Sequence, residues 1–234
     1  EIEHPSIVTE SGRGVVALSS MLLFDILDVT LYDSKTAPEI SDDDHHLIKD
    51  LMGVTEYLSA ERLQEAVNDA IYYRDEIRAY FRRGTLDIRA MARAESVFRY
   101  LVSKFKQLAI DIDIPPQLEE QLDGFADIYH GNLSLFQSLP DVWAIDQLHP
   151  IMPVQRLNEV PERRAVLSDI TCDSDGKVDR FVLADGVSKT LPVHEITDEE
   201  NYYIGVFFVG AYQETLGDLH NLFGDTNVVT ISLK

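Results

Sequence analysis

The chain has 234 residues, of which 45% are apolar and 26% charged, and its formal net charge is -21 at pH 7. This apolar fraction excludes a disordered chain, and no apolar run in the sequence is long enough to cross a bilayer. The single cysteine excludes an internal disulfide and favours a reducing compartment, so we expect a cytoplasmic protein. An acidic surface disfavours nucleic acid and membrane partners and favours small cations, although acidity also serves solubility alone.

The beginning of the chain combines β-like and helical patterns. A short β-like run at residues 7–10 leads into a flexible turn, Ser11-Gly12-Arg13-Gly14, and residues 15–20 are expected to form a helical turn. Residues 21–32 have apolar side chains at both parities, which predicts a long strand with both faces partly covered.

The middle of the chain predicts amphipathic helices, because its apolar residues recur at helical spacing. The expected helix starts are Ser41, Ser59, Asp87 and the pair Pro115-Pro116. We expect Gly84 to end the second helix as a left-handed cap. Short connections between these helices predict an antiparallel bundle.

After Asp127 the apolar period drops to two, which predicts a β-rich region. The candidate strands are residues 129–136, 151–154, 164–170, 178–183, 189–193, 203–209 and 228–233. Short helices are expected at residues 140–145 and 212–219, and we expect Trp143 in the first of them to be a packing residue.

The predicted fold is therefore mixed α and β: a Greek-key-like β-barrel or sandwich domain interrupted by an inserted antiparallel helical bundle. The β-domain is expected to begin with its first strand at residues 20–33 and to continue at residues 127–234, with the bundle at residues 34–126 between them. The last run, residues 229–234, resembles a strand cut before its end.

The only cysteine lies in an acidic turn, Ser168-Asp169-Ile170-Thr171-Cys172-Asp173-Ser174-Asp175-Gly176, which follows a β-like run. Neighbouring carboxylates disfavour a thiolate, so we expect Cys172 to stay a thiol, a poor metal ligand but a usable proton donor. The same carboxylates suit a cationic ligand. The alternative is an ordinary acidic β-turn with a half-buried cysteine.

Three separated motifs resemble, in this order, the pyridoxal-phosphate decarboxylases of the alanine-racemase-like fold, which include ornithine and diaminopimelate decarboxylases. The motifs are Glu10-Ser11-Gly12-Arg13, the Cys172-Asp173 turn, and Gly210-Ala211-Tyr212-Gln213-Glu214. Longer stretches, at residues 132–138, 161–167 and 220–226, resemble one branch of that family, the biosynthetic arginine decarboxylases. The resemblance covers nearly the whole β part and is weaker in the helical insertion.

The resemblance implies a cofactor site for pyridoxal phosphate. Glu10 would contact the ring nitrogen, Arg13 and Tyr212 would bind the phosphate, and Gly12 would let the backbone approach it. Taken alone, Glu10 and Arg13 would indicate only an ion pair on a surface turn. Residues 1–19 would be the end of the cofactor-binding domain, with the last strand of an otherwise missing TIM-type barrel.

The resemblance also implies an active site shared between subunits of a homo-oligomer, at least a dimer. Cys172 would reach the neighbouring subunit and donate a proton to the substrate carbon, while Asp173, and as a second acid Asp175, would bind the guanidinium of arginine. The products would be agmatine and carbon dioxide, for polyamine synthesis leading to putrescine and spermidine. The resemblance also makes magnesium a possible cofactor.

This chemistry needs a lysine that holds the cofactor as a Schiff base, and no lysine here stands in a matching motif. We therefore expect a C-terminal portion of such an enzyme that is inactive by itself. Two alternatives stay open. The chain could be a non-catalytic folding or oligomerisation module, or its parent could be a sister decarboxylase for another basic amino acid or a carboxylated polyamine.

Overall fold

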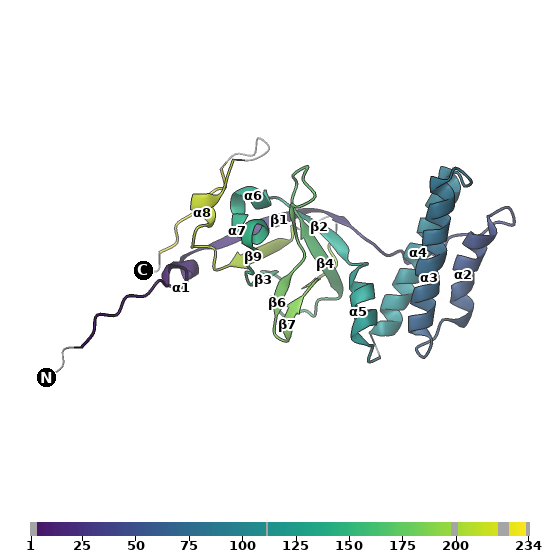
Figure 1. The fold of residues 1–234 in the computed structure, drawn as a ribbon, viewed down its shortest axis with the longest axis horizontal. Helices are drawn as coiled ribbons and strands as arrows, with labels where there is room; N and C mark the ends of the chain where they lie inside the picture. The colour runs from purple at the N-terminus through teal and green to yellow at the C-terminus, as the bar shows by residue number, and fades with distance from the viewer. Residues whose placement is uncertain (1–3, 111, 198–200, 220–224, 233–234) are drawn as a thin grey trace. The chain divides into compact units, whose positions relative to one another are not determined.

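The computed structural model describes residues 4–110, 112–197, 201–219 and 225–232 (Figure 1). The chain divides into two compact units, one formed by residues 1–30 with 128–234 and the other by residues 31–127. The first unit is β-rich and the second is helical, which confirms the predicted mixed fold with a helical insertion. None of the described helices is both long and apolar enough to cross a membrane.

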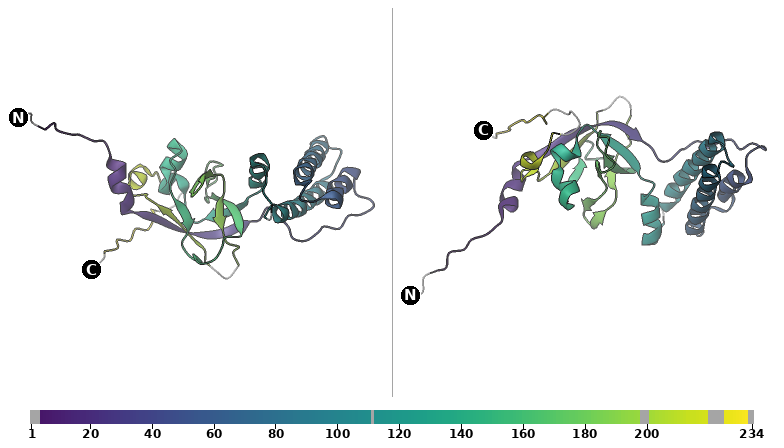
Figure 2. Two further views of the ribbon diagram at one scale, coloured as in Figure 1. Left: turned by 90° about the horizontal axis from the view of Figure 1, so that it is seen from below. Right: turned by 45° about the horizontal axis from the view of Figure 1, so that its top comes forward.

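The β-rich unit begins with a short helical segment that leads directly into a long strand (Figure 2). The elements are α1 (Gly12–Val16), the 3-10 helix η1 (Ala17–Ser19) and β1 (Met21–Thr30). The β-like run at residues 7–10 is not a strand, because no described residue pairs with its backbone, and its side chains are exposed. The expected last barrel strand is therefore not formed within the described chain.

Strand β1 lies in the middle of the main sheet, where it pairs antiparallel with β9 (Tyr203–Phe207) and with β2 (Asp127–Gly131). The order of the strands is β3-β9-β1-β2-β4-β5, with β8 paired to β4. Because β8 also contacts β3, the curled sheet nearly closes into a barrel. The further strands are β3 (Ile151–Pro153), β4 (Arg163–Ser168), β5 (Lys177–Val178) and β8 (Leu191–Val193), and β6 (Phe181–Leu183) with β7 (Gly186–Ser188) forms a separate hairpin.

The two faces of β1 differ in burial, as a period of two requires. Phe24 and Ile26 are buried in the core of the β-rich unit, whereas Leu23 and Leu27 on the opposite face are 52% and 54% exposed. Within this unit, the strand thus anchors the core with one set of side chains and leaves the other set uncovered.

The helical unit contains α2 (His46–Tyr57), α3 (Leu63–Arg82), α4 (Ile88–Ala109) and α5 (Pro116–Asp123). Their apolar faces share one core, in which residues such as Leu51, Val67 and Phe98 are fully buried. Asp87 caps α4 by accepting a hydrogen bond from the amide of Ala90, and Gly84 has φ +75°, as the sequence predicts.

The starts of α2 and α3 differ from the prediction. Ser41 does not cap a helix, because its hydroxyl accepts a bond from the amide of Asp43 within the preceding turn, while His45 caps α2 through Nδ1. Ser59 lies before α3, whose N-cap residue, Arg62, makes no side-chain capping bond. The two serines that we expected at the caps therefore belong to the turns that precede these helices.

Several predicted β segments also differ. Residues 135–138 form α6 (Leu135–Ser138) rather than the end of a strand, and residues 178–183 are divided between β5 and β6. Of residues 189–193, only Leu191–Val193 form a strand, β8, and residues 228–232 form no strand. The helix expected at residues 212–219 is shorter than predicted and consists of α8 (Gln213–Leu216). The helix expected at 140–145 is confirmed as α7 (Pro140–Ile145). Residues 220–224 of the 220–226 motif and Leu233 of the last predicted strand lie outside the described residues.

Candidate active site

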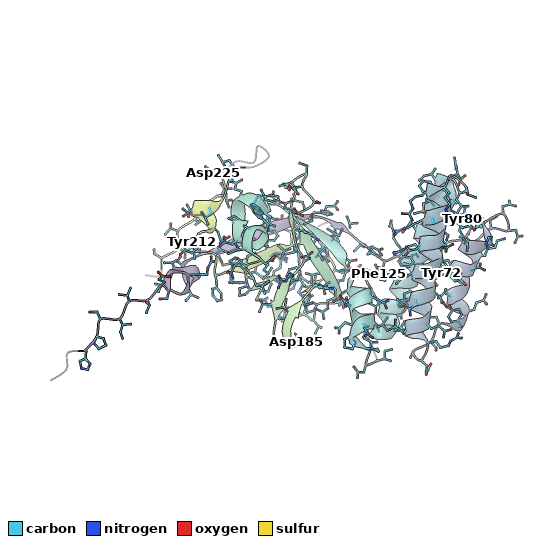
Figure 3. All side chains as sticks on the ribbon, viewed as in Figure 1. Tyr72, Tyr80, Phe125, Asp185, Tyr212 and Asp225 are labelled. Carbon is cyan, nitrogen blue, oxygen red and sulfur yellow. The ribbon has the colours of Figure 1, made fainter. Side chains whose placement is uncertain are left out.

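The structure brings Arg13 and Tyr212 together, although their motifs lie near opposite ends of the sequence. The guanidinium carbon of Arg13 lies 5.0 Å from the centre of the Tyr212 ring. Figure 3 labels Tyr212 where the chain enters α8. Both side chains stay accessible, since that of Arg13 is 35% exposed and Tyr212 is 49% exposed.

A buried carboxylate from α7 holds Arg13 in this position. The Nη2 atom of Arg13 donates to Oδ2 of Asp141 at 2.8 Å, and Asp141 is only 4% exposed. Asp141 stands in the first turn of α7, directly after Pro140, a residue that favours a helix start. The sequence motifs did not single out Asp141, because it makes this contact across 128 residues.

Gln213 completes the cluster by bonding to Asp141 through both ends of its amide. Its Nε2 donates to Oδ2 of Asp141 at 2.8 Å, and its Oε1 accepts from the amide of Asp141 at 3.3 Å. Burial alone would raise the pKa of Asp141, but the bonds from Arg13 and Gln213 and the charge of Arg13 hold it below its ordinary value. Asp141 is therefore a carboxylate that anchors the guanidinium.

The backbone near Tyr212 is constrained. Tyr212 has φ +70°, a left-handed conformation that is uncommon for an aromatic residue, and its hydroxyl lies 3.6 Å from where a Cβ on Gly12 would stand. Gly210 packs so closely against the backbone at Val16 and the side chain of Ser19 that a side chain at 210 would overlap both. The strained turn thus presents the phenol beside Gly12 and Arg13.

Glu10, the expected contact to the cofactor ring, is exposed and lies in the irregular segment before α1. Within the described residues, Glu10 has no hydrogen bond or ion pair with the residues of the Arg13 cluster. Its role stays a prediction from the motif.

The Cys172 turn is built around a buried acid that the sequence analysis gave no role. Asp169 is 6% exposed, and its carboxylate accepts bonds from the amide of Leu135 at 2.9 Å and from the amide of Thr171 at 3.0 Å. Gly176 closes the turn because any side chain there would overlap the Asp169 carboxylate. Asp169 therefore fixes the turn against the start of α6.

The outer part of this turn is open to solvent. Cys172 is exposed, and so are Asp173 and Asp175. Oδ1 of Asp173 accepts from the amide of Asp175 at 3.0 Å, the local bond of an Asx-turn. Exposed thiol and carboxylate groups on this hydrogen-bonded turn can contact a ligand or a second protein surface. The expectation of a half-buried cysteine in an ordinary turn does not match this exposure.

The run Asp42–Asp44 with His45 and His46 also contains residue types that can bind a metal ion. Among the described residues, no group of three or more His, Cys, Asp or Glu side chains is arranged to hold a metal ion. His45 instead caps α2, and burial, followed by the charge of His46, lowers its pKa.

Comparisons with known proteins agree with the motifs. Residues 41–123 match the family model of the arginine decarboxylase helical bundle domain. The chain is 46% identical to the biosynthetic arginine decarboxylase of Phocaeicola vulgatus over 99% of its own length and 37% of the relative's length. It is also 46% identical to the enzyme of the same name from Bacteroides thetaiotaomicron, over 100% of this chain and 37% of that protein.

A solved structure gives the same result. The crystal structure of the biosynthetic arginine decarboxylase SpeA from Campylobacter jejuni matches with a TM-score of 0.71 and 33% identity, over 91% of this chain and 34% of that one. The resemblance that the motifs indicated is confirmed. The chain spans little more than a third of the length of the curated relatives named above.

Proposed function

We propose that this chain forms part of an arginine decarboxylase that uses pyridoxal phosphate, because over its whole length it is similar to biosynthetic arginine decarboxylases. The reaction would convert L-arginine to agmatine and carbon dioxide for polyamine synthesis, in the cytoplasm. The observation that carries the proposal is the cluster of Arg13, Asp141 and Tyr212 at Gly12, which joins two of the three motifs.

The residues of this cluster fit a phosphate group. Arg13 uses Nη2 for Asp141 and retains its other N–H groups, and the hydroxyl of Tyr212 stands beside Gly12. A guanidinium and a phenol on an accessible surface are donors that a phosphate accepts from. Asp141 orients Arg13 through one nitrogen and leaves the rest of the guanidinium unoccupied.

When bound, pyridoxal phosphate supplies an electron sink that lets the substrate lose its carboxylate as carbon dioxide. Arg13 and Tyr212 would hold the phosphate, and Glu10 would accept a hydrogen bond from the ring nitrogen. Gly12 would leave room for the backbone to approach. The lysine that binds this cofactor in the family has no counterpart motif in the sequence, so we assign no residue here to that role.

The Cys172 turn would act on the substrate. Asp173 keeps lone pairs that its bond to the Asp175 amide does not use, so it can accept from a guanidinium. Cys172 would hold a proton on Sγ and donate it to the substrate carbon. Because both side chains are exposed on this chain, we infer that they serve the active site of a second subunit. We assign magnesium no site, since the described residues offer no group of metal ligands.

The test uses the decarboxylase polypeptide that contains this sequence, with two matched Tyr→Phe variants. Tyr212→Phe removes one charge-assisted bond to the phosphate, so we expect cofactor binding to weaken about tenfold to a hundredfold. Tyr203→Phe is the control, because the hydroxyl of Tyr203, on strand β9, instead accepts a bond from the side-chain Nδ2 of Asn201. The cofactor dissociation constant would be measured by absorbance.

Equal cofactor affinities in the two variants would refute the phosphate site. Arginine decarboxylation by the unmodified polypeptide tests the activity separately. A polypeptide that binds the cofactor but does not release carbon dioxide from arginine would favour a sister decarboxylase. A polypeptide that neither binds the cofactor nor decarboxylates arginine would favour the non-catalytic module.

A further inference from the structure

The two side chains proposed to bind the phosphate come from separate segments of the chain. Arg13 stands in α1, whereas Tyr212 stands directly before α8. The guanidinium carbon lies 5.0 Å from the centre of the Tyr212 ring, but the described residues show no hydrogen bond between these two side chains. One phosphate group can accept from both donors only if the two segments keep a fixed spacing.

The side chain of Gln213 joins the two segments. Gln213 follows Tyr212 in the sequence and is only 3% exposed. Its Nε2 atom donates to Oδ2 of Asp141 at 2.8 Å, and the same oxygen accepts from Nη2 of Arg13 at 2.8 Å. The carboxylate of Asp141 therefore connects α1 to the start of α8, with Arg13 bonded on one side and Gln213 on the other.

These contacts use the full donor capacity of the Gln213 amide. A side-chain amide has two N–H donors and one carbonyl acceptor. Besides its bond to Asp141, Nε2 donates to the carbonyl of Ala211 at 3.0 Å, and Oε1 accepts from the backbone amide of Asp141 at 3.3 Å. A methionine has a similar length but makes none of these bonds, and a carboxylate could accept but not donate. The position therefore requires an amide.

The Gln213 amide also supports the strained backbone that carries the phenol. Tyr212 has φ +70°, and Phe208, in the same connection from β9 to α8, has φ +63°. Left-handed backbone at such residues persists only where the surrounding structure holds it. The bond from Gln213 to the carbonyl of Ala211 acts directly before Tyr212, and the amide of Leu216 donates to the carbonyl of Tyr212 at 2.8 Å. Loss of the Gln213 amide would remove the first of these supports.

We propose that Gln213 is a positioning residue, which holds the hydroxyl of Tyr212 and the guanidinium of Arg13 at one spacing so that the cofactor phosphate can contact both. Gln213 is buried and its donors are engaged, so it acts through these two side chains and not by touching the phosphate. The inference rests on the proposed function, because it assumes that Arg13 and Tyr212 bind the phosphate. It deepens that function by assigning part of the affinity for the phosphate to a residue outside the contact.

The experiment compares pyridoxal phosphate with pyridoxal, which has the same ring but no phosphate. Both are titrated by absorbance into the decarboxylase polypeptide and into its Gln213→Met variant, which keeps the length of the side chain without its amide. We expect the dissociation constant of pyridoxal phosphate to rise at least about tenfold, because the bond to a charged partner that aligns the two donors is lost. The dissociation constant of pyridoxal should stay within about twofold. A residue that only stabilised the fold would affect both ligands alike.

Gln155→Met is the matched control. The Nε2 atom of Gln155 donates to the carbonyl of Asn201 at 2.7 Å, and its Oε1 accepts from the amide of Tyr203 at 3.2 Å. This glutamine thus also bonds through both ends of its amide within the β-rich unit, but to no residue of the Arg13 cluster. The affinity of the control for pyridoxal phosphate should stay within about twofold of that of the unmodified polypeptide.

A double-mutant cycle tests whether Gln213 acts through the phenol. Residues that work as one unit give losses that do not multiply, whereas independent residues give losses that do. Combining Gln213→Met with Tyr212→Phe should therefore weaken the binding of pyridoxal phosphate by at least about threefold less than the product of the two single losses. A combined loss equal to that product would show that Gln213 contributes independently of Tyr212, which overturns the proposal.

The fluorescence of Trp143, the only tryptophan, checks the fold of each variant. Trp143 stands in α7, as Asp141 does, and it is 51% exposed and contacts Phe136 with a distance of 5.3 Å between ring centres, so it is only partly the packing residue that we expected. If Gln213→Met does not fold, Gln213→Ala makes the same comparison, because it lacks the amide and cannot overfill the site. If neither variant folds, Gln213 serves the fold as a whole and the proposal is overturned.

Failure of this proposal can be distinguished from failure of the proposed function. If the unmodified polypeptide binds pyridoxal phosphate and decarboxylates arginine, while Gln213→Met binds the cofactor equally well, only the positioning role is overturned. An equal loss of pyridoxal phosphate and pyridoxal, or an equal loss in the Gln155→Met control, also overturns that role alone. An unmodified polypeptide that does not bind pyridoxal phosphate refutes the proposed function, and the positioning role with it.

Discussion

Replacing Asp141 with asparagine should destabilise the β-rich unit and release Arg13. The side-chain amide of the Asp141→Asn variant can still accept the bond from Gln213, but the variant loses the charge that attracts the guanidinium at 2.8 Å. A hydrogen bond to a charged group contributes about 1.5–3 kcal/mol when buried. The side chain of Arg13 is 35% exposed and would regain some solvation, so we expect a loss of about 1–2 kcal/mol.

The assay is urea unfolding of the 234-residue chain followed by the fluorescence of Trp143, which lies in the β-rich unit. With a slope of about 2 kcal/mol/M, the expected loss lowers the midpoint by about 0.5–1 M. Asp185→Asn is the matched control, since it makes the same change on an exposed turn. A midpoint that falls no further than the control's would refute the reasoning.

The same variant predicts a pH dependence with a definite sign. The folded pKa of Asp141 lies below its unfolded value, so its stabilising contribution is complete above the unfolded pKa and is lost as the pH falls through the folded one. The gap in stability between the unmodified chain and Asp141→Asn should therefore be widest near neutral pH and shrink in acid. A gap that widens on acidification would contradict the ion pair as its cause.

Three further changes test the Cys172 turn. In the decarboxylase polypeptide, Asp173→Asn should lower kcat/KM for arginine about thirtyfold to a thousandfold while cofactor affinity stays intact. This loss corresponds to about 2–4 kcal/mol of transition-state stabilisation. A loss under about threefold would show that Asp173 only shapes the turn. Asp169→Ala should cost about 2–3 kcal/mol in urea unfolding, because the buried amide of Leu135 loses its acceptor, and a cost below about 0.5 kcal/mol would show that the turn does not depend on it. Mixing an inactive Cys172→Ala polypeptide with one that lacks the cofactor lysine should restore part of the decarboxylase activity, and no recovery after proven subunit exchange would place the site within one chain.

The helices could be predicted where local signals decide them. The apolar spacing and the Asp87 cap located α4, because both act within one turn of the helix. The predicted cap of α2 was wrong, because Ser41 bonds within a turn that precedes the helix. Likewise, Leu135 has β-like neighbours in sequence, but its amide donates to Asp169, and the chain turns into α6 there.

The candidate site could be predicted only in part, for a similar reason. The motifs identified Arg13 and Tyr212, which the structure places together. They did not identify Asp141, because a carboxylate that anchors an arginine is defined by a contact across the fold. Single sequences contain no local pattern for such contacts. The exposure of Cys172 likewise depends on how its turn packs against α6, which the residues of the turn alone do not determine.

The register of β1 and β2 has a consequence for how this protein could be rebuilt. Thr30 stands opposite Ile128 in the antiparallel pair, so the whole helical unit leaves and returns to the β-rich unit at neighbouring positions. A tight Asn-Gly turn joining the two strands is geometrically the same connection, shortened to a hairpin. We therefore expect that a short hairpin turn can replace the helical unit, and that the unit can be inserted into another antiparallel hairpin whose two strand ends are paired with each other.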